Sequence, residues 1–346
     1  MSTVPPLSAR IPTPVRLPVP SHPDVHEWRP ATAADVDAIH ATQRAMDAVD
    51  HPTWTTPRSE IAEDFESAHI DVAADSLLAL AVDGTVLAWG MTPLGPGQES
   101  RVQSYVLGGV HPDWRERGIG RELMAWQIAR STQQLASSDK TLPGWTVSYQ
   151  EESNASGAAL ARRFGMRLER YFTSMERVIA EPVPDLATPD GITVVPYSSE
   201  LAEATRIARN DAFRDHWGSQ PTLEERWRQF VEGEEFRDDL SWVAVEDDAD
   251  GGRRVVAFAL STINEGDWEV QGFSSGYVAL IGVVRDRRRR GLAPACISAL
   301  LRSYADAGLE KAILDVDTES PTGANTLYSG MGFAPTTRSL AFVIER

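Results

Sequence analysis

The sequence predicts an α/β protein made of two tandem copies of one fold, each a mixed, mostly antiparallel central sheet flanked by helices. Three observations support this prediction. The chain has 346 residues, and a domain typically takes about 100–200 residues, so two domains are expected. The segment 110–120 is repeated, with changes, at 283–293. Strand-like and helical patterns follow one another in the same order around both segments.

Each half is predicted to open with a strand and a helix and to continue with a pair of strands. A further strand then leads through an Arg/Gly-containing turn into a helix, and strand, short helix and closing strand follow. In the first half the strands and helices before the last short helix are expected at 28–30, 33–49, 77–91, 102–110, 122–135 and 144–149. In the second half they are expected at 193–197, 201–213, 242–263, 276–284, 294–307 and 311–316.

The spacing of matched residues supports an internal repeat. Arg115 and Gly118 lie 173 positions before Arg288 and Gly291. A second match, Phe164-Gly165-Met166 with Met331-Gly332-Phe333, has a spacing of 167. The repeat predicts an N-terminal domain over 28–180 and a C-terminal domain over 192–346, with the proline-bearing segment 181–191 as linker. The proline-rich arm 1–27 is expected either to stay mobile or to lie along the body.

Composition excludes several classes of protein. The formal net charge of −17 repels polyanions, so we expect no nucleic-acid partner. No apolar run approaches the roughly 20 residues of a membrane span, and the N-terminus lacks the pattern of a signal peptide. Cys296 is the one cysteine, which excludes an intrachain disulfide and indicates a reducing, cytoplasmic location. Its apolar helical surroundings favour a core residue over a nucleophile.

The repeated turn is the clearest candidate binding site. A strand, a glycine-bearing turn and a helix N-terminus together present free backbone N–H groups and the positive end of a helix dipole to a phosphate. Arginines add bidentate donors. One copy of such a pattern is equally well explained as a solvated surface turn, whereas two copies favour a binding site. The arginine-rich run 285–290 also permits a nucleic-acid patch, but it coincides with the second turn and the chain is acidic.

The motifs resemble those of the GCN5-related N-acetyltransferase (GNAT) superfamily. The segment 110–120 fits its signature V-x-P-x-x-R-x-x-G-I-G, and Leu327-Tyr328-x-x-x-Gly332-Phe333 resembles its last motif. The tandem layout is similar to that of the mycothiol synthases. The resemblance implies acetyl-CoA as cosubstrate, no metal, and direct attack of an amine on the thioester. By this resemblance the coenzyme-binding residues are Gly108, Gly109, Val110, Arg115, Glu116, Arg117, Gly118, Ile119, Gly120 and Arg121 in the first copy, and Ile281, Gly282, Val283, Arg288, Arg289, Arg290, Gly291, Leu292, Ala293, Pro294 and Asn325 in the second.

The two copies differ where the family places its proton donor. A tyrosine four residues before the last-motif glycine usually protonates the leaving thiolate. Tyr328 occupies this position in the second copy and Ala161 in the first. A phenol can give a proton and a methyl group cannot, so the C-terminal copy is predicted to be catalytic and the N-terminal copy non-catalytic. The alternative for Tyr328 is a packed aromatic residue with a bonded hydroxyl.

Two departures leave the general base open. An asparagine common before the last motif is kept as Asn154, but Pro321 stands in the second copy, where Asn325 follows four residues later. The mycothiol synthases carry a glutamate early on the central strand of the second copy, and Tyr277 stands here instead. Candidate bases are therefore Glu265, Asp267, Glu269 and His216, each of which is also readable as a surface residue.

The sequence thus predicts an acetyl-CoA-dependent N-acetyltransferase acting on a primary amine of a small molecule. Two alternatives remain open at this point. One is a non-catalytic acyl-CoA-binding module, and the other is a protein lysine acetyltransferase, because one fold can serve many acceptors.

Overall fold

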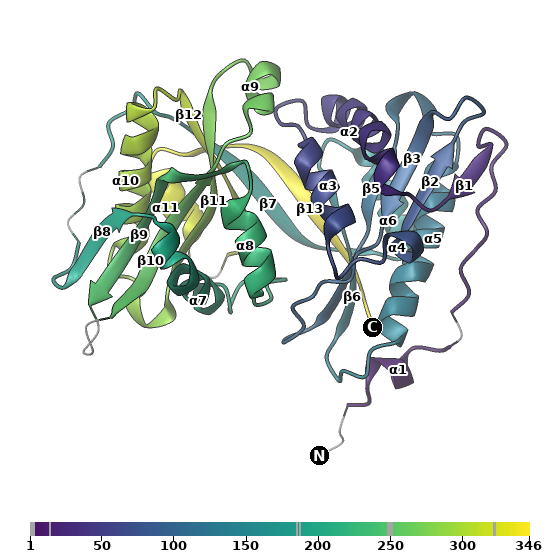
Figure 1. The fold of residues 1–346 in the computed structure, drawn as a ribbon, viewed down its shortest axis with the longest axis horizontal. Helices are drawn as coiled ribbons and strands as arrows, with labels where there is room; N and C mark the ends of the chain where they lie inside the picture. The colour runs from purple at the N-terminus through teal and green to yellow at the C-terminus, as the bar shows by residue number, and fades with distance from the viewer. Residues whose placement is uncertain (1–3, 14, 185, 187, 248–251, 321–322) are drawn as a thin grey trace. The chain divides into compact units, whose positions relative to one another are not determined.

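We analysed a computed structural model of the chain, which describes residues 4–13, 15–184, 186, 188–247, 252–320 and 323–346 (Figure 1). The chain forms two compact units. The first comprises Met1–Tyr171 and Ser339–Arg346, and the second comprises Phe172–Arg338. Each unit is an α/β assembly of the predicted class, with helices on both faces of a sheet. Pro321 and residues 185 and 187 of the expected linker lie outside the described residues.

The first unit contains four antiparallel strands in the order β1-β2-β3-β5, and a second group in which β4 pairs in parallel with β6. Its strands are β1 (Glu27–Arg29), β2 (Ser76–Leu80), β3 (Val86–Met91), β4 (Val102–Tyr105), β5 (Leu107–Val110), β6 (Gly144–Glu151) and the start of β7 (Arg167–Val178). Its helices are α1 (Leu7–Arg10), α2 (Val36–Asp50), α3 (Arg58–Glu66), α4 (Val72–Asp75), α5 (Ile119–Ala136) and α6 (Ala155–Arg163).

The second unit repeats this plan. Strands β8 (Ile192–Pro196), β9 (Phe236–Asp247), β10 (Arg253–Thr262) and β11 (Ser275–Val283) pair antiparallel in that order, and β11 then pairs in parallel with β12 (Lys311–Asp317). Its helices are α7 (Ala202–Ala212), α8 (Glu224–Glu232), α9 (Glu265–Gln271), α10 (Leu292–Asp306) and α11 (Ala324–Gly330), and the chain closes with β13 (Ala334–Glu345).

The two units exchange their closing strands. Strand β7 follows α6 of the first copy, yet its residues Phe172 to Val178 pair antiparallel with β12 of the second unit. Strand β13 follows α11 of the second copy, yet its residues Ser339 to Glu345 pair antiparallel with β6 of the first unit. Each sheet is therefore completed by the other copy's last strand, so the boundaries 28–180 and 192–346 predicted from the repeat do not coincide with the compact units.

Local sequence explains how the short 3-10 helix η1 (Ala33–Asp35), which leads into α2, begins. The backbone N–H and the side-chain hydroxyl of Thr32 both donate to Asp35, 2.8 Å each, in a capping box. Such caps satisfy orphan donors at a helix start. Arg29 also donates to both Asp35 oxygens, at 2.8 and 2.6 Å, and this guanidinium is the main cause that lowers the pKa of Asp35 to about 2. The entry into α2 is therefore tied to β1.

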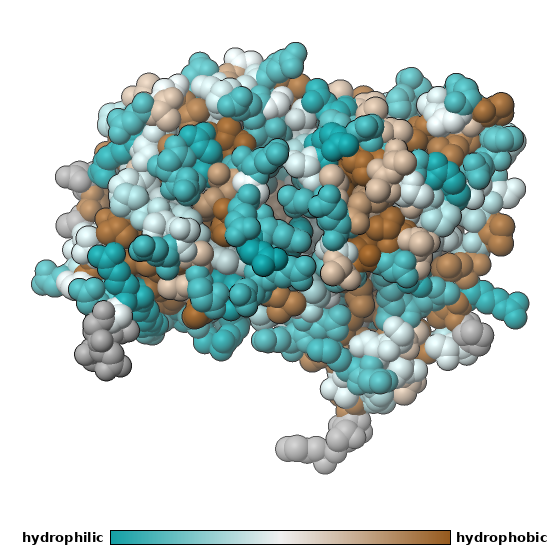
Figure 2. All heavy atoms as spheres, in the orientation of Figure 1, coloured by the Kyte–Doolittle hydropathy of each residue, from teal (hydrophilic) through white to brown (hydrophobic). Residues whose placement is uncertain are grey.

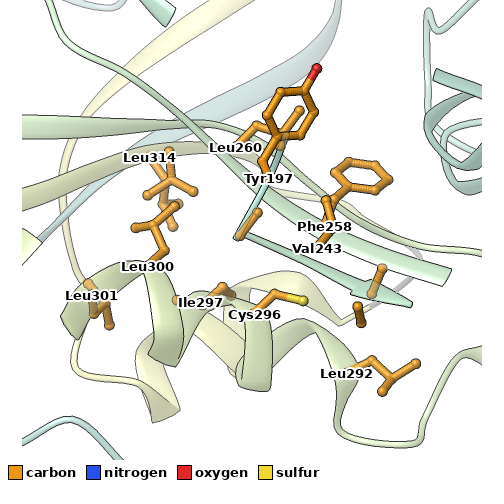
Figure 3. Close-up of a cluster of buried hydrophobic side chains, with 14 of the residues drawn as sticks. Tyr197, Val243, Phe258, Leu260, Leu292, Cys296, Ile297, Leu300, Leu301 and Leu314 are labelled. Atoms are coloured by element: carbon orange, nitrogen blue, oxygen red, sulfur yellow. The ribbon is translucent and has the colours of Figure 1, made fainter. Parts of the chain in front are cut away.

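The core of the second unit lies between its sheet and α10 (Figure 3). The apolar face of α10 contributes Leu292, Cys296, Ile297, Leu300 and Leu301, all nearly or fully buried. Burial raises the pKa of the Cys296 thiol to about 12. Cys296 is therefore an inert core residue, as the apolar pattern around it predicts.

The N-terminal arm lies along the first unit. Leu7 is fully buried in a cluster with Val102 and Leu135, and the Leu7 backbone N–H donates to the Lys140 carbonyl, 2.9 Å. Further along, His22 Nε2 lies 2.8 Å from the Arg117 carbonyl. Of the two possibilities for the arm, the described part from residue 4 onward is packed on the body.

On the face drawn in Figure 2 hydrophilic residues are widespread, and apolar residues appear between them in small groups. Among the described residues, no helix has the length and hydropathy required to cross a bilayer.

Candidate functional site

A strand that leaves its neighbour opens a cavity in the first unit. The Val106 N–H still donates to the Val147 carbonyl of β6, 2.8 Å, but β5 beyond it pairs with β3 alone. The gap between β5 and β6 becomes a cavity of about 560 Å³. Of the predicted coenzyme residues, eight line it: Gly108, Gly109, Val110, Arg115, Glu116, Gly118, Gly120 and Arg121. Ile119 is instead fully buried in the core.

The same divergence occurs in the second unit. Strand β11 pairs with β12 only over Ser275, Gly276 and Tyr277. Its remainder pairs with β10, while β12 continues along β7. The predicted residues Ile281, Gly282 and Val283 lie on the part of β11 that has diverged from β12. Gly282 is required there, because a Cβ at this position would lie 2.3 Å from the Phe258 ring.

Both turns have the same unusual backbone. Glu116 and Arg289, which are equivalent in the repeat, have φ of 63° and 62°, and they are the two non-glycine residues with positive φ in the described chain. Gly118 and Gly291 follow with φ of 104° and 78° and directly precede α5 and α10. A left-handed non-glycine residue costs roughly 1–3 kcal/mol, and such residues cluster at functional sites. Two identical strained turns at helix N-termini are suited to anion binding.

The arginines of the turns have different tasks. Arg115 donates through both terminal nitrogens to Asp50, 2.7 Å each, and Arg288 donates to Asp215, 2.9 Å, and to the Ala212 carbonyl, 2.9 Å. Arg115 thus fastens the first turn to the last residue of α2, and Arg288 fastens the second turn to the last residue of α7 and to the loop after it. Arg285 and Arg287 are paired with Asp211 and Glu246.

Arg289 and Arg290, by contrast, are exposed. Neither has an ion pair with a described carboxylate, so their charges are available to a ligand. Leu292 is buried, and it can serve a ligand at the turn only through its backbone.

Tyr328 lies on α11 and is 7% exposed. Its ring contacts Phe333 edge-on, with centroids 6.1 Å apart. Burial raises the pKa of its phenol, which keeps the hydroxyl protonated. Ala161, its counterpart on α6, is fully buried against Phe342 of β13. Asn325 on α11 donates to the carbonyls of Asp317 and Thr318, 3.1 and 3.0 Å, and so holds the loop that follows β12.

The candidate bases from the sequence lie apart from one another. Glu265, Asp267 and Glu269 lie on α9, which precedes β11, and not on the strand. His216 lies in the loop after α7, with its ring 4.6 Å from that of Phe213. Burial, and next the Arg288 charge, lower the pKa of His216. The charge of Asp317 at the end of β12 also acts on the pKa of His216, so the two residues lie near each other.

A polar pair that the sequence analysis missed lies where β11 and β12 separate. The Tyr277 hydroxyl donates to Asp315 Oδ2, 3.0 Å, from β11 to β12. The repeat spacing of 167 residues makes Asp315 the equivalent of Ser148, which lines the first cavity. This equivalence was the available signal, because Ser148 lines the cavity of the first unit.

The first cavity has a second polar region that the sequence did not reveal. His51 stacks flat on Trp54, with centroids 3.4 Å apart, and both residues line the cavity. His51 Nε2 lies 3.2 Å from Asp47, and although burial acts against it, this carboxylate raises the pKa of His51. Across the described ranges, no group of three or more His, Cys, Asp or Glu side chains is arranged to hold a metal ion.

Comparisons with known proteins agree with this geometry. The acetyltransferase (GNAT) family profile matches residues 202–333. A mycothiol acetyltransferase from Nocardioides sp. is 28% identical over 76% of this chain and 95% of its own length, and one from Salinispora tropica is 30% identical over 65% of this chain and 68% of its own. Among solved structures, a GCN5-related N-acetyltransferase from Sphaerobacter thermophilus superposes with a TM-score of 0.68 at 26% identity, covering 94% of this chain and 97% of that one.

Proposed function

Because the chain belongs to the acetyltransferase (GNAT) family, we propose that it transfers the acetyl group of acetyl-CoA to a primary amine of a small molecule, and that the C-terminal copy catalyses this transfer. The profile match lies within that copy. The acidic net charge of −17 favours a cationic amine over a nucleic acid as partner. One buried, unpaired cysteine fits a reducing compartment, and we place the enzyme in the cytoplasm.

The residues around the divergence of β11 and β12 fit the coenzyme by their chemistry. Backbone N–H groups at the start of α10, together with the exposed Arg289 and Arg290, would receive its phosphates. The unpaired edge of β11 at Ile281 to Val283 would receive the pantetheine amides, as an added strand would. When bound there, acetyl-CoA supplies the activated acyl group. The chain's own residues then have to orient the amine, accept its proton and return a proton to the thiolate.

One observation carries the assignment of the catalytic copy. Tyr328 is a buried phenol in the second copy, held protonated, and its counterpart Ala161 has no proton to give. The first copy keeps the strained turn and the cavity of about 560 Å³. We therefore propose that the first copy binds coenzyme without turnover.

A thiol-release screen tests the proposed reaction. The whole chain would be incubated with acetyl-CoA and panels of amino sugars, polyamines, aminoglycosides, lysine-containing peptides and the desacetyl form of mycothiol, and free thiol would be measured. The panel includes the last compound because the relatives are named mycothiol acetyltransferases. We expect release above the hydrolysis background with a small-molecule amine. Release only with peptides would make the protein a lysine acetyltransferase, and coenzyme binding without release would make it a sensor.

A further inference from the structure

We propose that Asp315 is the general base of the second copy and that Tyr277 is its positioning residue. The inference rests on the proposed function, since it assigns the step that removes the proton of the attacking ammonium. In chemical terms, the Asp315 carboxylate takes one proton from the R–NH₃⁺ acceptor. The freed amine lone pair forms the N–C bond to the acetyl carbon and the C–S bond breaks. Tyr328 donates its proton to the thiolate sulfur, and the second proton leaving the new amide nitrogen restores the Tyr328 phenol.

Asp315 lies where β12 leaves β11, two residues beyond Ile313, the last β12 residue that pairs with β11. Leu314 and Val316 on either side are buried in the core, and alternate residues of a strand face opposite sides of a sheet. The side chain of Asp315 therefore faces away from that core, and its residue keeps solvent contact.

Residues of both neighbouring strands donate hydrogen bonds to Asp315. Besides the bond from Tyr277, Asp315 receives one from the Ser174 side chain on β7. Tyr328 lies near enough to Tyr277 that its charge, if ionised, would raise the pKa of Tyr277. The carboxylate of β12 and the phenol of β11 thus form a bonded pair, and the predicted proton donor on α11 lies near that phenol. Acid and base with environments that separate their pKa values are a recurring arrangement in active sites.

The first copy has no carboxylate at the position equivalent to Asp315. At the equivalent positions the first copy has Ser104 and Ser148. Ser104 donates to Gln134, 2.7 Å, and Ser148 accepts from Gln150, 2.9 Å. Neither hydroxyl can act as a base near neutral pH. The copy that lacks the phenol at Ala161 therefore also lacks the carboxylate, and both chemical groups occur together in the second copy.

Electrostatics supports the assignment. Crowding by protein atoms raises the pKa of Asp315, and the hydrogen bonds from Ser174 and Tyr277 lower it by less. A carboxylate whose pKa is raised above its ordinary value is a stronger base than a surface aspartate. The Asp315 carboxylate would also supply the proton acceptor in a protein that has Tyr277 in place of a strand glutamate.

The test compares Asp315→Asn with wild type in two measurements. Calorimetry with acetyl-CoA reports binding, and thiol release with the best amine of the screen reports kcat/KM between pH 5 and 9. The asparagine is nearly isosteric but cannot accept the proton. We expect coenzyme affinity to stay within about twofold and kcat to fall by about 10²–10⁴-fold. The wild-type loss of activity at acid pH, as Asp315 becomes protonated, should disappear from the variant. Asp306→Asn, the same change at an exposed position on α10, is the matched control and should keep wild-type turnover.

Tyr277→Phe separates positioning from bulk structure. The lost hydrogen bond raises the pKa of Asp315, so the acid limb of the profile should move to higher pH while coenzyme binding persists. Wild-type turnover in Asp315→Asn would overturn the inference, as would a loss of coenzyme affinity as large as the loss of turnover. If Asp315→Asn keeps the loss of activity at acid pH and His216→Gln abolishes that loss, the base is His216. A wild-type protein that turns over no amine would instead overturn the proposed function and this inference together.

Discussion

At the scale of residues, the proposed mechanism depends on the protonation of Tyr328 and Asp315. Tyr328 is shielded from water, and burial raises the pKa of its phenol. The hydroxyl therefore holds its proton at any physiological pH, which suits a donor to a thiolate formed nearby. Desolvation also raises the pKa of Asp315. In the proposed mechanism, shielding from water therefore affects the pKa of both the acid and the base.

Tyr328→Phe tests the acid directly. The change keeps the ring and its contact with Phe333 but removes the proton. We expect kcat to fall by about 10²–10⁴-fold while the affinity for acetyl-CoA barely changes. Tyr304→Phe is the matched control, because Tyr304 is a fully buried tyrosine of the same unit whose hydroxyl lies 2.6 Å from Ser261 Oγ. It should lose about 0.5–1.5 kcal/mol of stability and keep its turnover. Equal turnover in wild type and Tyr328→Phe would remove Tyr328 from the mechanism.

The sequence motif gave Tyr328 a proposed role through its distance to Gly332, and the apolar helical neighbours of Cys296 predicted its place in the core. Asp315 was not singled out, because an aspartate on an alternating strand is usually a solvated residue. The anchoring of Arg115 on Asp50 and of Arg288 on Asp215 could not be predicted either, since those partners lie more than 60 residues away in sequence.

At the scale of elements, the strand–turn–helix unit is what both copies share. The left-handed residue, the left-handed glycine and the following helix are the same in both turns. Because strain of this kind persists only where the surrounding structure enforces it, the turns are rigid features and not loops that could adapt to any ligand. The two parallel-strand divergences lie directly before them.

Gly291→Glu tests the second turn. It adds a negative charge and a side chain where phosphate would approach, so affinity for acetyl-CoA should fall at least tenfold in calorimetry. Any L-residue at φ 78° is strained, and the control must carry the same strain. Gly308→Glu does so, since Gly308 has φ 75°, lies beyond the other end of α10 and, like Gly291, has open space around its Cβ position. Equal losses of affinity in both variants would show that only folding was affected.

The elements themselves were largely predictable from their patterns. The expected helix at 33–49 is η1 (Ala33–Asp35) followed by α2, and the helix at 294–307 is α10 with its start two residues earlier. The short helices α3, α8 and α9 were not predicted. Each is polar over most of its length and buries at most one side chain, so the apolar periodicity on which such predictions rest is weak there.

At the scale of the whole molecule, the exchange of closing strands ties the copies together. Sequence repeats report which segments are alike, but they do not report which strand a segment pairs with. The exchange was therefore beyond prediction from the repeat. Its consequence is that the last residues of the second copy form part of the first unit's core: Phe342 of β13 is fully buried with Ala158, Ala161 and Met166.

Phe342→Ala tests that exchange. Removing a buried phenyl ring costs about 3–5 kcal/mol, and the loss should fall on the first unit. Hydrogen exchange should speed up in β6 and α6 more than in β12 and α10. Phe258→Ala, a fully buried phenylalanine of the second unit, should give the opposite distribution. A Phe342→Ala protein with faster exchange mainly in α10 and β12 would mean that β13 completes its own copy.

The central claim is a division of labour between the copies, and turnover of two matched variants tests it most directly. Gly118→Glu and Gly291→Glu place the same charge in equivalent left-handed positions of the two turns. Both would be assayed for thiol release with the same amine, and for stabilisation against heat by added acetyl-CoA, which reports binding to the folded state. We expect Gly118→Glu to keep most of its turnover while losing part of that stabilisation, and Gly291→Glu to lose its turnover. An inactive Gly118→Glu enzyme beside an active Gly291→Glu enzyme would contradict the account and place catalysis in the first copy.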